Sequence, residues 1–163
     1  MKKNTLALVG VVLVAGVVNL GVGFKLGWGR PVVSDSVYFR QLAVSMAEGR
    51  GYRMDDGYWP GQPSMRRMPG WPFLISLGLR TGAKISPDAM MRVGALGLNG
   101  LAALLVFGLT MRLLRRPGAA CLAGVGYALH PTALYEAYQG LSEPLFIVLA
   151  LAGVWLLLSD RWG

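Results

Sequence analysis

Long stretches without charged side chains constrain the fold of this chain more than any other feature. The segments 4–24 and 93–111 contain no charged residue at all. A helix needs about 20 consecutive apolar residues to cross the hydrocarbon core of a bilayer. We therefore predict an all-α integral membrane protein with four transmembrane helices, at 5–24, 88–114, 118–134 and 141–158.

Composition agrees with this class and excludes others. Hydrophobic residues make up 54% of the chain and charged residues only 15%, whereas soluble domains carry about 25% charged residues. The single cysteine, Cys121, excludes a disulfide within the chain. The net charge of +8 comes from residues that flank apolar stretches. This distribution favours anionic membrane lipids as partners and argues against nucleic acid.

The first apolar stretch has two interpretations. A secretory leader has an apolar core of about 7–15 residues and a small-x-small cleavage site. The stretch 4–24 is longer, and no clear site of that kind precedes Lys25. We expect it to remain as a membrane helix, and a cleaved leader is the alternative.

Basic residues in short loops predict the orientation, because such loops stay on the cytoplasmic side. The residues that mark this side are Lys2, Lys3, Arg112, Arg115, Arg116 and Arg161. Four crossings then place both termini in the cytoplasm and the segment 25–87 outside a plasma (inner) membrane. This outer loop carries nine basic residues, which we interpret as functional.

The outer loop is predicted to contain two interfacial helices. Apolar residues from Asp35 to Glu48 recur at helical spacing, and Gly49 is a typical helix terminator. The stretch at about 69–80 is too short to cross a bilayer. We expect helices at about 35–48 and 69–80 to lie on the outer surface.

Two features inside the predicted spans indicate helix packing. Asn99 lies in mid-span, where an amide is expected to hydrogen-bond to a neighbouring helix. Ala120, Gly124 and Ala128 form a face of small residues four apart, which favours close approach of another helix.

Several short motifs together resemble a known family. Along the chain they are Ser34-Asp35-x-x-Tyr38, Gly49-x-Gly51-Tyr52, Arg67-x-Pro69-Gly70-x-Pro72, Ser86-Pro87 with Arg92, His130-Pro131 and Ser142-Glu143-Pro144. Their order and spacing resemble the N-terminal portion of GT-C membrane glycosyltransferases, in the protein mannosyltransferase-like and aminoarabinose transferase-like branch. The resemblance covers essentially the whole chain, although each motif alone is weakly specific.

The resemblance implies transfer of a sugar from a polyprenyl-phosphate carrier to an acceptor at the outer membrane face. Asp35 matches the family's acidic residue in the first outer loop, a catalytic base or metal-linked acid. Arg66 and Arg67, with Arg40, are candidates to bind the lipid phosphate, because guanidinium groups bind phosphate oxygens through paired hydrogen bonds. Serines flank Asp35 where relatives have a second acid, so a divalent metal stays an open alternative and no other cofactor is implied.

A further set of side chains is a candidate lining for the sugar pocket: Tyr38, Trp71, His130, Tyr138 and Glu143. Each has a structural alternative. The aromatic residues fit an interfacial belt, Glu143 fits a helix cap, and His130 fits a structural hydrogen bond. Asp35 likewise suits a helix N-terminus, where the dipole favours a negative charge. The arginines suit ordinary contacts with lipid headgroups.

Members of this family are much longer than 163 residues. We therefore expect this sequence to be part of a longer enzyme, with a non-catalytic paralogue or a half-site completed by a partner chain as alternatives. The competing function is a small four-helix membrane protein that binds anionic lipid or a partner chain without catalysis. The donor sugar and the acceptor are not identified by the sequence.

Overall fold

The computed structural model describes residues 2–28, 30–32, 35–54, 67–82 and 84–159. In these ranges the chain forms seven helices and no β-strand. They are α1 (Lys2–Leu26), α2 (Asp35–Ala47), α3 (Gly70–Arg80), α4 (Pro87–Leu114), α5 (Pro117–Ala128), α6 (Pro131–Gln139) and α7 (Glu143–Ser159). The all-α prediction is therefore confirmed for the described residues.

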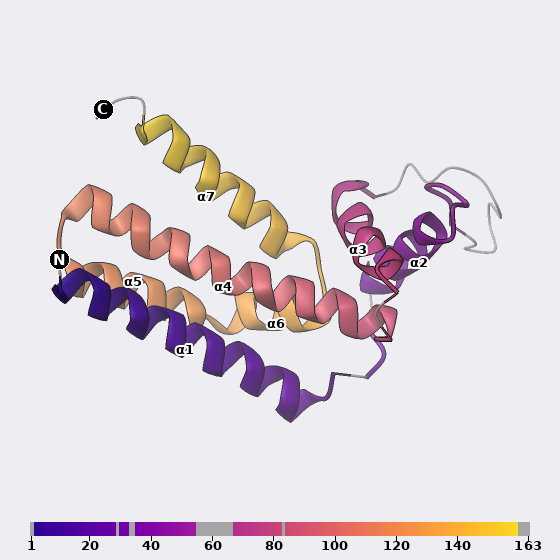
Figure 1. The fold of residues 1–163 in the computed structure, drawn as a ribbon, viewed down its shortest axis with the longest axis horizontal. Coiled ribbons are helices and arrows are strands. Elements are labelled where there is room, and N and C mark those ends of the chain that lie inside the picture. Colours follow the sequence, from indigo (N-terminus) through magenta and orange to yellow (C-terminus); the bar gives the residue numbers. More distant parts are fainter. Residues whose placement is uncertain (1, 29, 33–34, 55–66, 83, 160–163) are drawn as a thin grey trace.

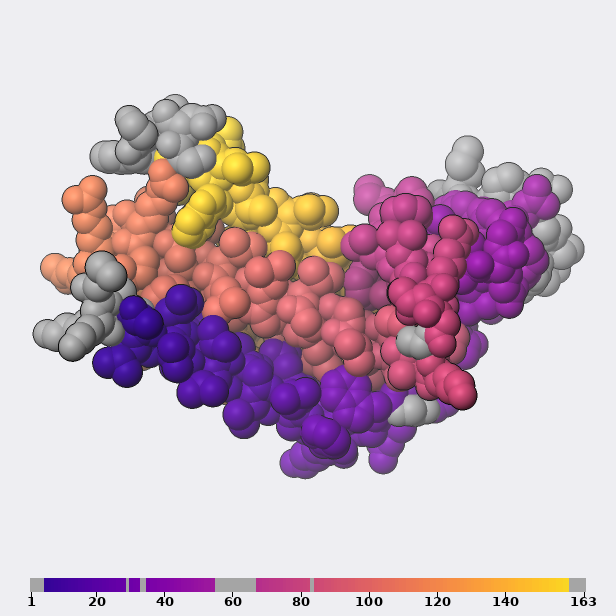
Figure 2. All heavy atoms as spheres, viewed as in Figure 1, coloured from indigo at the N-terminus to yellow at the C-terminus, as the bar shows by residue number. Residues whose placement is uncertain are grey.

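Helix α4 is the centre of the structure and packs against every other helix. Figure 1 shows α1, α5 and α6 along one side of α4 and α7 along the other. Helices α2 and α3 gather at the end where α4 begins, and Figure 2 shows them as a lobe on the elongated body. Successive long segments run in alternating directions, so α1 begins and α7 ends away from this lobe (Figure 1).

Two helices are long and apolar enough to span a membrane. These segments are Thr5–Leu26 in α1 and Pro87–Leu114 in α4, with mean hydropathies of 2.4 and 1.9. Helix α7 is apolar but shorter. Large apolar side chains are exposed along α1, among them Leu6, Leu13, Val17 and Phe24. An exposed apolar surface of this length is typical of contact with lipid or with another protein.

The predicted continuous helix at 118–134 is instead two helices, α5 and α6. Pro131 causes the division, because proline has no N–H to donate and its ring clashes with the preceding helical turn. It occupies the first turn of α6, where that N–H is not needed. His130 caps α6 by accepting a hydrogen bond at Nδ1 from the N–H of Ala133, at 3.4 Å. Helix α6 therefore occupies the region where the predicted third span ends and the connection to the fourth begins.

The two packing predictions inside the apolar helices are confirmed. The Asn99 side chain donates through Nδ2 to Oδ1 of Asn19 on α1, at 3.0 Å. Ala120, Gly124 and Ala128 are all buried. A Cβ on Gly124 would lie 3.0 Å from a methyl group of Val11 and 3.1 Å from the carbonyl oxygen of Ala103. Small residues thus allow α5 to approach α1 and α4 closely.

Candidate functional site

Three segments that are distant in sequence meet around Arg67 at the lobe. Asp35 and Tyr38 come from the first turn of α2, Tyr52 follows that helix, and Arg67 precedes α3. Nη2 of Arg67 donates to Oδ1 of Asp35 at 2.5 Å. The Arg67 guanidinium also lies over the Tyr38 ring, 5.4 Å from its centroid. The hydroxyl of Tyr52 donates to the backbone carbonyl of Arg67 at 2.6 Å.

The local sequence explains why these groups meet. Asp35 occupies the first turn of α2, where the helix dipole favours a carboxylate. Gly49 and Gly51 have positive φ angles, of 77° and 81°, which residues with a Cβ rarely adopt. These glycines turn the chain after α2, and Tyr52 follows them directly. Packing of α2 against α3 then brings Arg67 to the start of α2.

The ion pair between Asp35 and Arg67 is accessible from solvent. The Asp35 side chain is 53% exposed and that of Arg67 is 32% exposed. Exposed pairs of this kind contribute about 0–1 kcal/mol to stability. The pair therefore costs little to open when an anionic ligand competes for the guanidinium.

Burial raises the pKa of the Tyr52 hydroxyl above its ordinary value near 10.0, and the positive charge of Arg67 opposes this rise. The phenol therefore stays protonated at neutral pH. A protonated hydroxyl can donate its hydrogen bond to the Arg67 carbonyl, and this bond fixes the backbone that carries the guanidinium.

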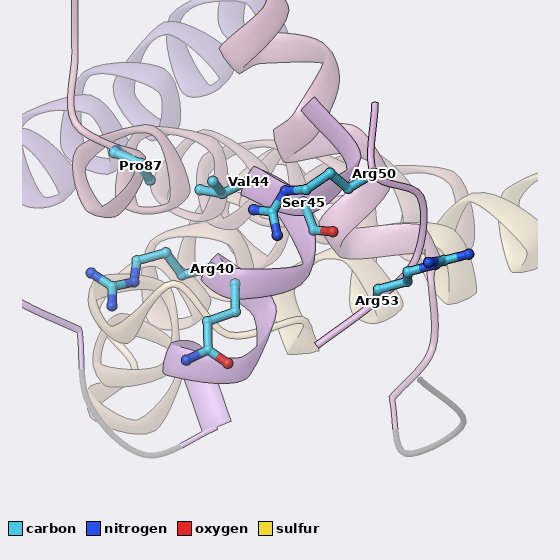
Figure 3. Close-up of a pocket in the computed structure, with 7 residues that line it drawn as sticks. Arg40, Val44, Ser45, Arg50, Arg53 and Pro87 are labelled. Carbon is cyan, nitrogen blue, oxygen red and sulfur yellow. The ribbon is translucent and has the colours of Figure 1, made fainter. Parts of the chain in front are cut away.

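The other predicted phosphate ligands are placed differently. Arg40 lies 3.6 Å from the carboxylate of Asp88, in the first turn of α4. It lines a pocket on the lobe together with Arg50 and Arg53 (Figure 3). Arg66 lies outside the described residues.

The remaining pocket candidates make contacts of their own in the fold. Trp71 is buried in a core cluster that α2 and α3 form with α4 and α6, and its indole N–H donates to the carbonyl of Gly140 at 2.8 Å. The Tyr138 hydroxyl donates to the carbonyl of Leu26 at 2.9 Å. His130 caps α6, and Glu143 is the exposed first residue of α7. The structure therefore brings Tyr38 alone of this set to the Asp35–Arg67 pair.

Arg92 is a buried charged residue to which the sequence reasoning assigned no role. Its side chain is almost fully buried, with 1% of the residue exposed. Nη1 donates to the carbonyl of Trp28 at 2.6 Å and Nε donates to that of Tyr138 at 3.0 Å. The guanidinium also lies 4.6 Å from the centroid of the Tyr138 ring. The sequence signal for this role is an arginine near the start of an apolar helix, because a charge there is costly unless it has partners.

The described residues contain no group of three or more His, Cys, Asp or Glu side chains arranged to hold a metal ion. Within the described ranges, the groups that meet at this site are one carboxylate, one guanidinium and two phenols. Comparisons with protein-family models, curated proteins and solved structures find no match to this chain.

Proposed function

We propose that this chain carries the outer catalytic loop of a membrane glycosyltransferase. The enzyme takes a sugar from a polyprenyl-phosphate carrier and transfers it to an acceptor at the outer membrane face. The observation that carries the proposal is the direct contact between Asp35 and Arg67. It joins a candidate general base to a candidate phosphate ligand at an exposed position.

The two groups have complementary roles in such a transfer. The Asp35 carboxylate accepts the proton of the acceptor hydroxyl as that oxygen attacks the anomeric carbon. The bond from this carbon to the phosphate oxygen breaks, and the carrier phosphate leaves with the electron pair. The Arg67 guanidinium stabilises the negative charge that develops on this phosphate. In the free protein Asp35 neutralises Arg67, and the phosphate replaces the carboxylate as its partner on binding.

The membrane setting is part of the proposal. Helices α1 and α4 are long enough to cross, and the alternating directions of α1, α4, α5 with α6, and α7 are compatible with four crossings. In this arrangement the lobe of α2 and α3 lies at the outer surface and both termini lie in the cytoplasm. The apolar side chains exposed on α1 and α7 then face lipid.

The test is transfer of radiolabelled sugar from a panel of polyprenyl-phosphate donors, in membranes that contain the wild-type chain or a variant. We expect Asp35→Asn to abolish transfer and Arg67→Lys to reduce it strongly, because lysine lacks the planar paired donors of arginine. Glu48→Gln is the matched control, since Glu48 is an exposed carboxylate at the other end of α2. Full activity of Asp35→Asn would contradict the assignment of Asp35 as the base. Absence of transfer by inserted, folded wild type would favour a part of a longer enzyme or a protein without catalysis.

A further inference from the structure

A shallow groove lies at the end of the structure opposite the lobe. Helices α1 and α7 each pack against α4, and Figure 2 shows the surface of α4 between them. The groove has a volume of about 530 Å³, which is within the range of pockets that hold small ligands. Its lining comes from all three helices and consists of Thr5, Leu8, Phe107, Gly108, Met111, Arg112 and Trp155.

The groove combines an apolar wall with one cation. Leu8, Phe107 and Met111 supply apolar surface, and Arg112 is the only charged residue among the described residues that line the groove. Arg112 lies in the last turn of α4, so the positive charge is at the end of the helix. An apolar surface that ends at a cation matches the polarity of a phospholipid, with its acyl chain and its anionic headgroup.

Contacts with α7 hold the Arg112 guanidinium at the groove. Nη2 donates to the carbonyl of Leu158 at 2.7 Å, and the group lies 5.8 Å from the centroid of the Trp155 ring. Gly108 leaves room for this ring, because a Cβ there would lie 2.5 Å from it. Nε and Nη1 of Arg112 make no hydrogen bond within the part of the chain that the structure describes. Their N–H groups are therefore available to the oxygen atoms of a phosphate.

Charge at this end of the molecule favours an anion. Arg115 lines a neighbouring pocket together with Arg112, and its side chain has no ion pair or hydrogen bond with any described residue. The segment 160–163 lies outside the described residues and contains one acidic and one basic side chain, Asp160 and Arg161. Asp160 neutralises one guanidinium at most. At least one of the two arginines therefore keeps its positive charge, whatever the position of Asp160.

We propose that this groove binds an anionic phospholipid, with the phosphate at Arg112 and Arg115 and one acyl chain against the apolar wall. The proposal uses the membrane orientation given above, which places this end in the cytoplasmic leaflet, and it is independent of the sugar transfer. Basic pockets between membrane helices on the cytoplasmic side are suited to anionic headgroups. Trp155 suits the same depth, because tryptophan is enriched at the membrane interface.

The experiment measures which lipid stays on the full chain. The protein is reconstituted in nanodiscs of equal parts phosphatidylglycerol and phosphatidylcholine and released into detergent, and the retained lipid is identified by native mass spectrometry. Arg112→Gln and Arg115→Gln remove the proposed headgroup contacts. Arg116→Gln is the matched control, because Arg116 is exposed beside Arg115 and lines neither pocket.

A second pair of variants tests the apolar wall without a change of charge. Leu8→Trp fills part of the groove, since Leu8 belongs to its lining. Leu13→Trp is the control, because Leu13 is exposed on the same helix and lies outside the groove.

We expect wild type to retain phosphatidylglycerol in preference to phosphatidylcholine. Arg112→Gln and Arg115→Gln are each expected to lower this preference about fivefold, as loss of one basic residue near an anionic headgroup implies. Leu8→Trp is expected to lose the retained lipid. Arg116→Gln and Leu13→Trp are expected to match wild type.

Three results would overturn the proposal. Equal retention of the two lipids by wild type would identify adventitious lipid only, and equal losses in Arg115→Gln and Arg116→Gln would indicate an effect of general surface charge. Full retention in Leu8→Trp would exclude the acyl chain from the groove. Arg115→Gln is decisive if Arg112→Gln unfolds, because the Arg115 side chain supports no described contact. Asp35→Asn is expected to retain lipid as wild type does, which separates this site from the proposed transfer.

Discussion

Replacement of the buried Arg92 is expected to weaken the structure where the lobe meets the long helices. The guanidinium joins three parts of the chain, since it lies on α4 and donates to the carbonyls of Trp28, after α1, and Tyr138, in α6. The Arg92→Met variant keeps most of the side-chain volume and removes both donors. It leaves two carbonyl oxygens without these partners, in hydrogen bonds that are partly buried.

The expected magnitude follows from these contacts. Each carbonyl left unsatisfied costs about 1–3 kcal/mol, and loss of the contact with the Tyr138 ring costs about 1 kcal/mol more. Removal of the buried charge returns part of this cost, because the guanidinium no longer has to be desolvated. We therefore expect a net loss of about 3 kcal/mol. For a chain of this size this corresponds to a Tm lower by about 6–12 °C.

The assay is thermal unfolding in detergent, followed by tryptophan fluorescence. Arg92→Lys retains the charge and one donor group, so it is expected to fall between wild type and Arg92→Met. Arg30→Met is the control, because Arg30 is exposed, and its Tm is expected to match that of wild type. A Tm for Arg92→Met that is equal to that of wild type would show that the two carbonyl contacts do not stabilise the fold.

Three further predictions concern individual contacts. Tyr52→Phe removes the hydrogen bond to the Arg67 carbonyl and is expected to cost about 1 kcal/mol at neutral pH in thermal unfolding. The pKa of Tyr52 is raised in the folded state, so as the pH rises above about 10 the phenol ionises in the unfolded chain before it ionises in the folded one. Wild-type stability is therefore expected to fall with rising pH in this range. A dependence of stability on pH that is parallel in wild type and Tyr52→Phe would refute this. Asn19→Ala and Asn99→Ala are expected to show a coupling energy of about 0.6–1.7 kcal/mol in a double-mutant cycle, because Asn99 donates a hydrogen bond to Asn19. Additive effects of the two substitutions on stability would contradict this coupling. Gly124→Val is expected to lower the stability by about 1–3 kcal/mol, because the added side chain overpacks against Val11 and Ala103. Gly126→Val is the control, because nothing lies within 4 Å of its Cβ position. Equal Tm values for the two variants would argue against close packing at Gly124.

Sequence pattern predicted the local structure of most helices well. Expected helices at 35–48 and 69–80 correspond to α2 (Asp35–Ala47) and α3 (Gly70–Arg80). Apolar periodicity and terminating glycines are local signals, so they can be read without knowledge of the fold. The break between α5 and α6 was not predicted, because the apolar length of 118–134 favoured one continuous helix. Proline inside an apolar run, here Pro131, is nevertheless a recognisable signal of a helix break.

The candidate site depends more strongly on tertiary structure. Asp35 and Arg67 were both selected from sequence for their chemistry, but their contact was not predicted. They lie 32 positions apart, and their approach depends on how α2 packs against α3. Arg40 was assigned to phosphate as well, whereas the fold places it beside Asp88, facing a different pocket.

The sequence by itself determined that the chain forms apolar helices with a basic, turn-rich segment between the first two long ones. The length of a charge-free stretch and the spacing of its apolar residues are properties of neighbouring residues. They therefore predict helices without tertiary information. Only the tertiary structure decided that Arg92 is buried between carbonyls and that Arg67 is paired with Asp35. These contacts join residues distant in sequence, and helix packing selects them from many pairings that the same composition would permit.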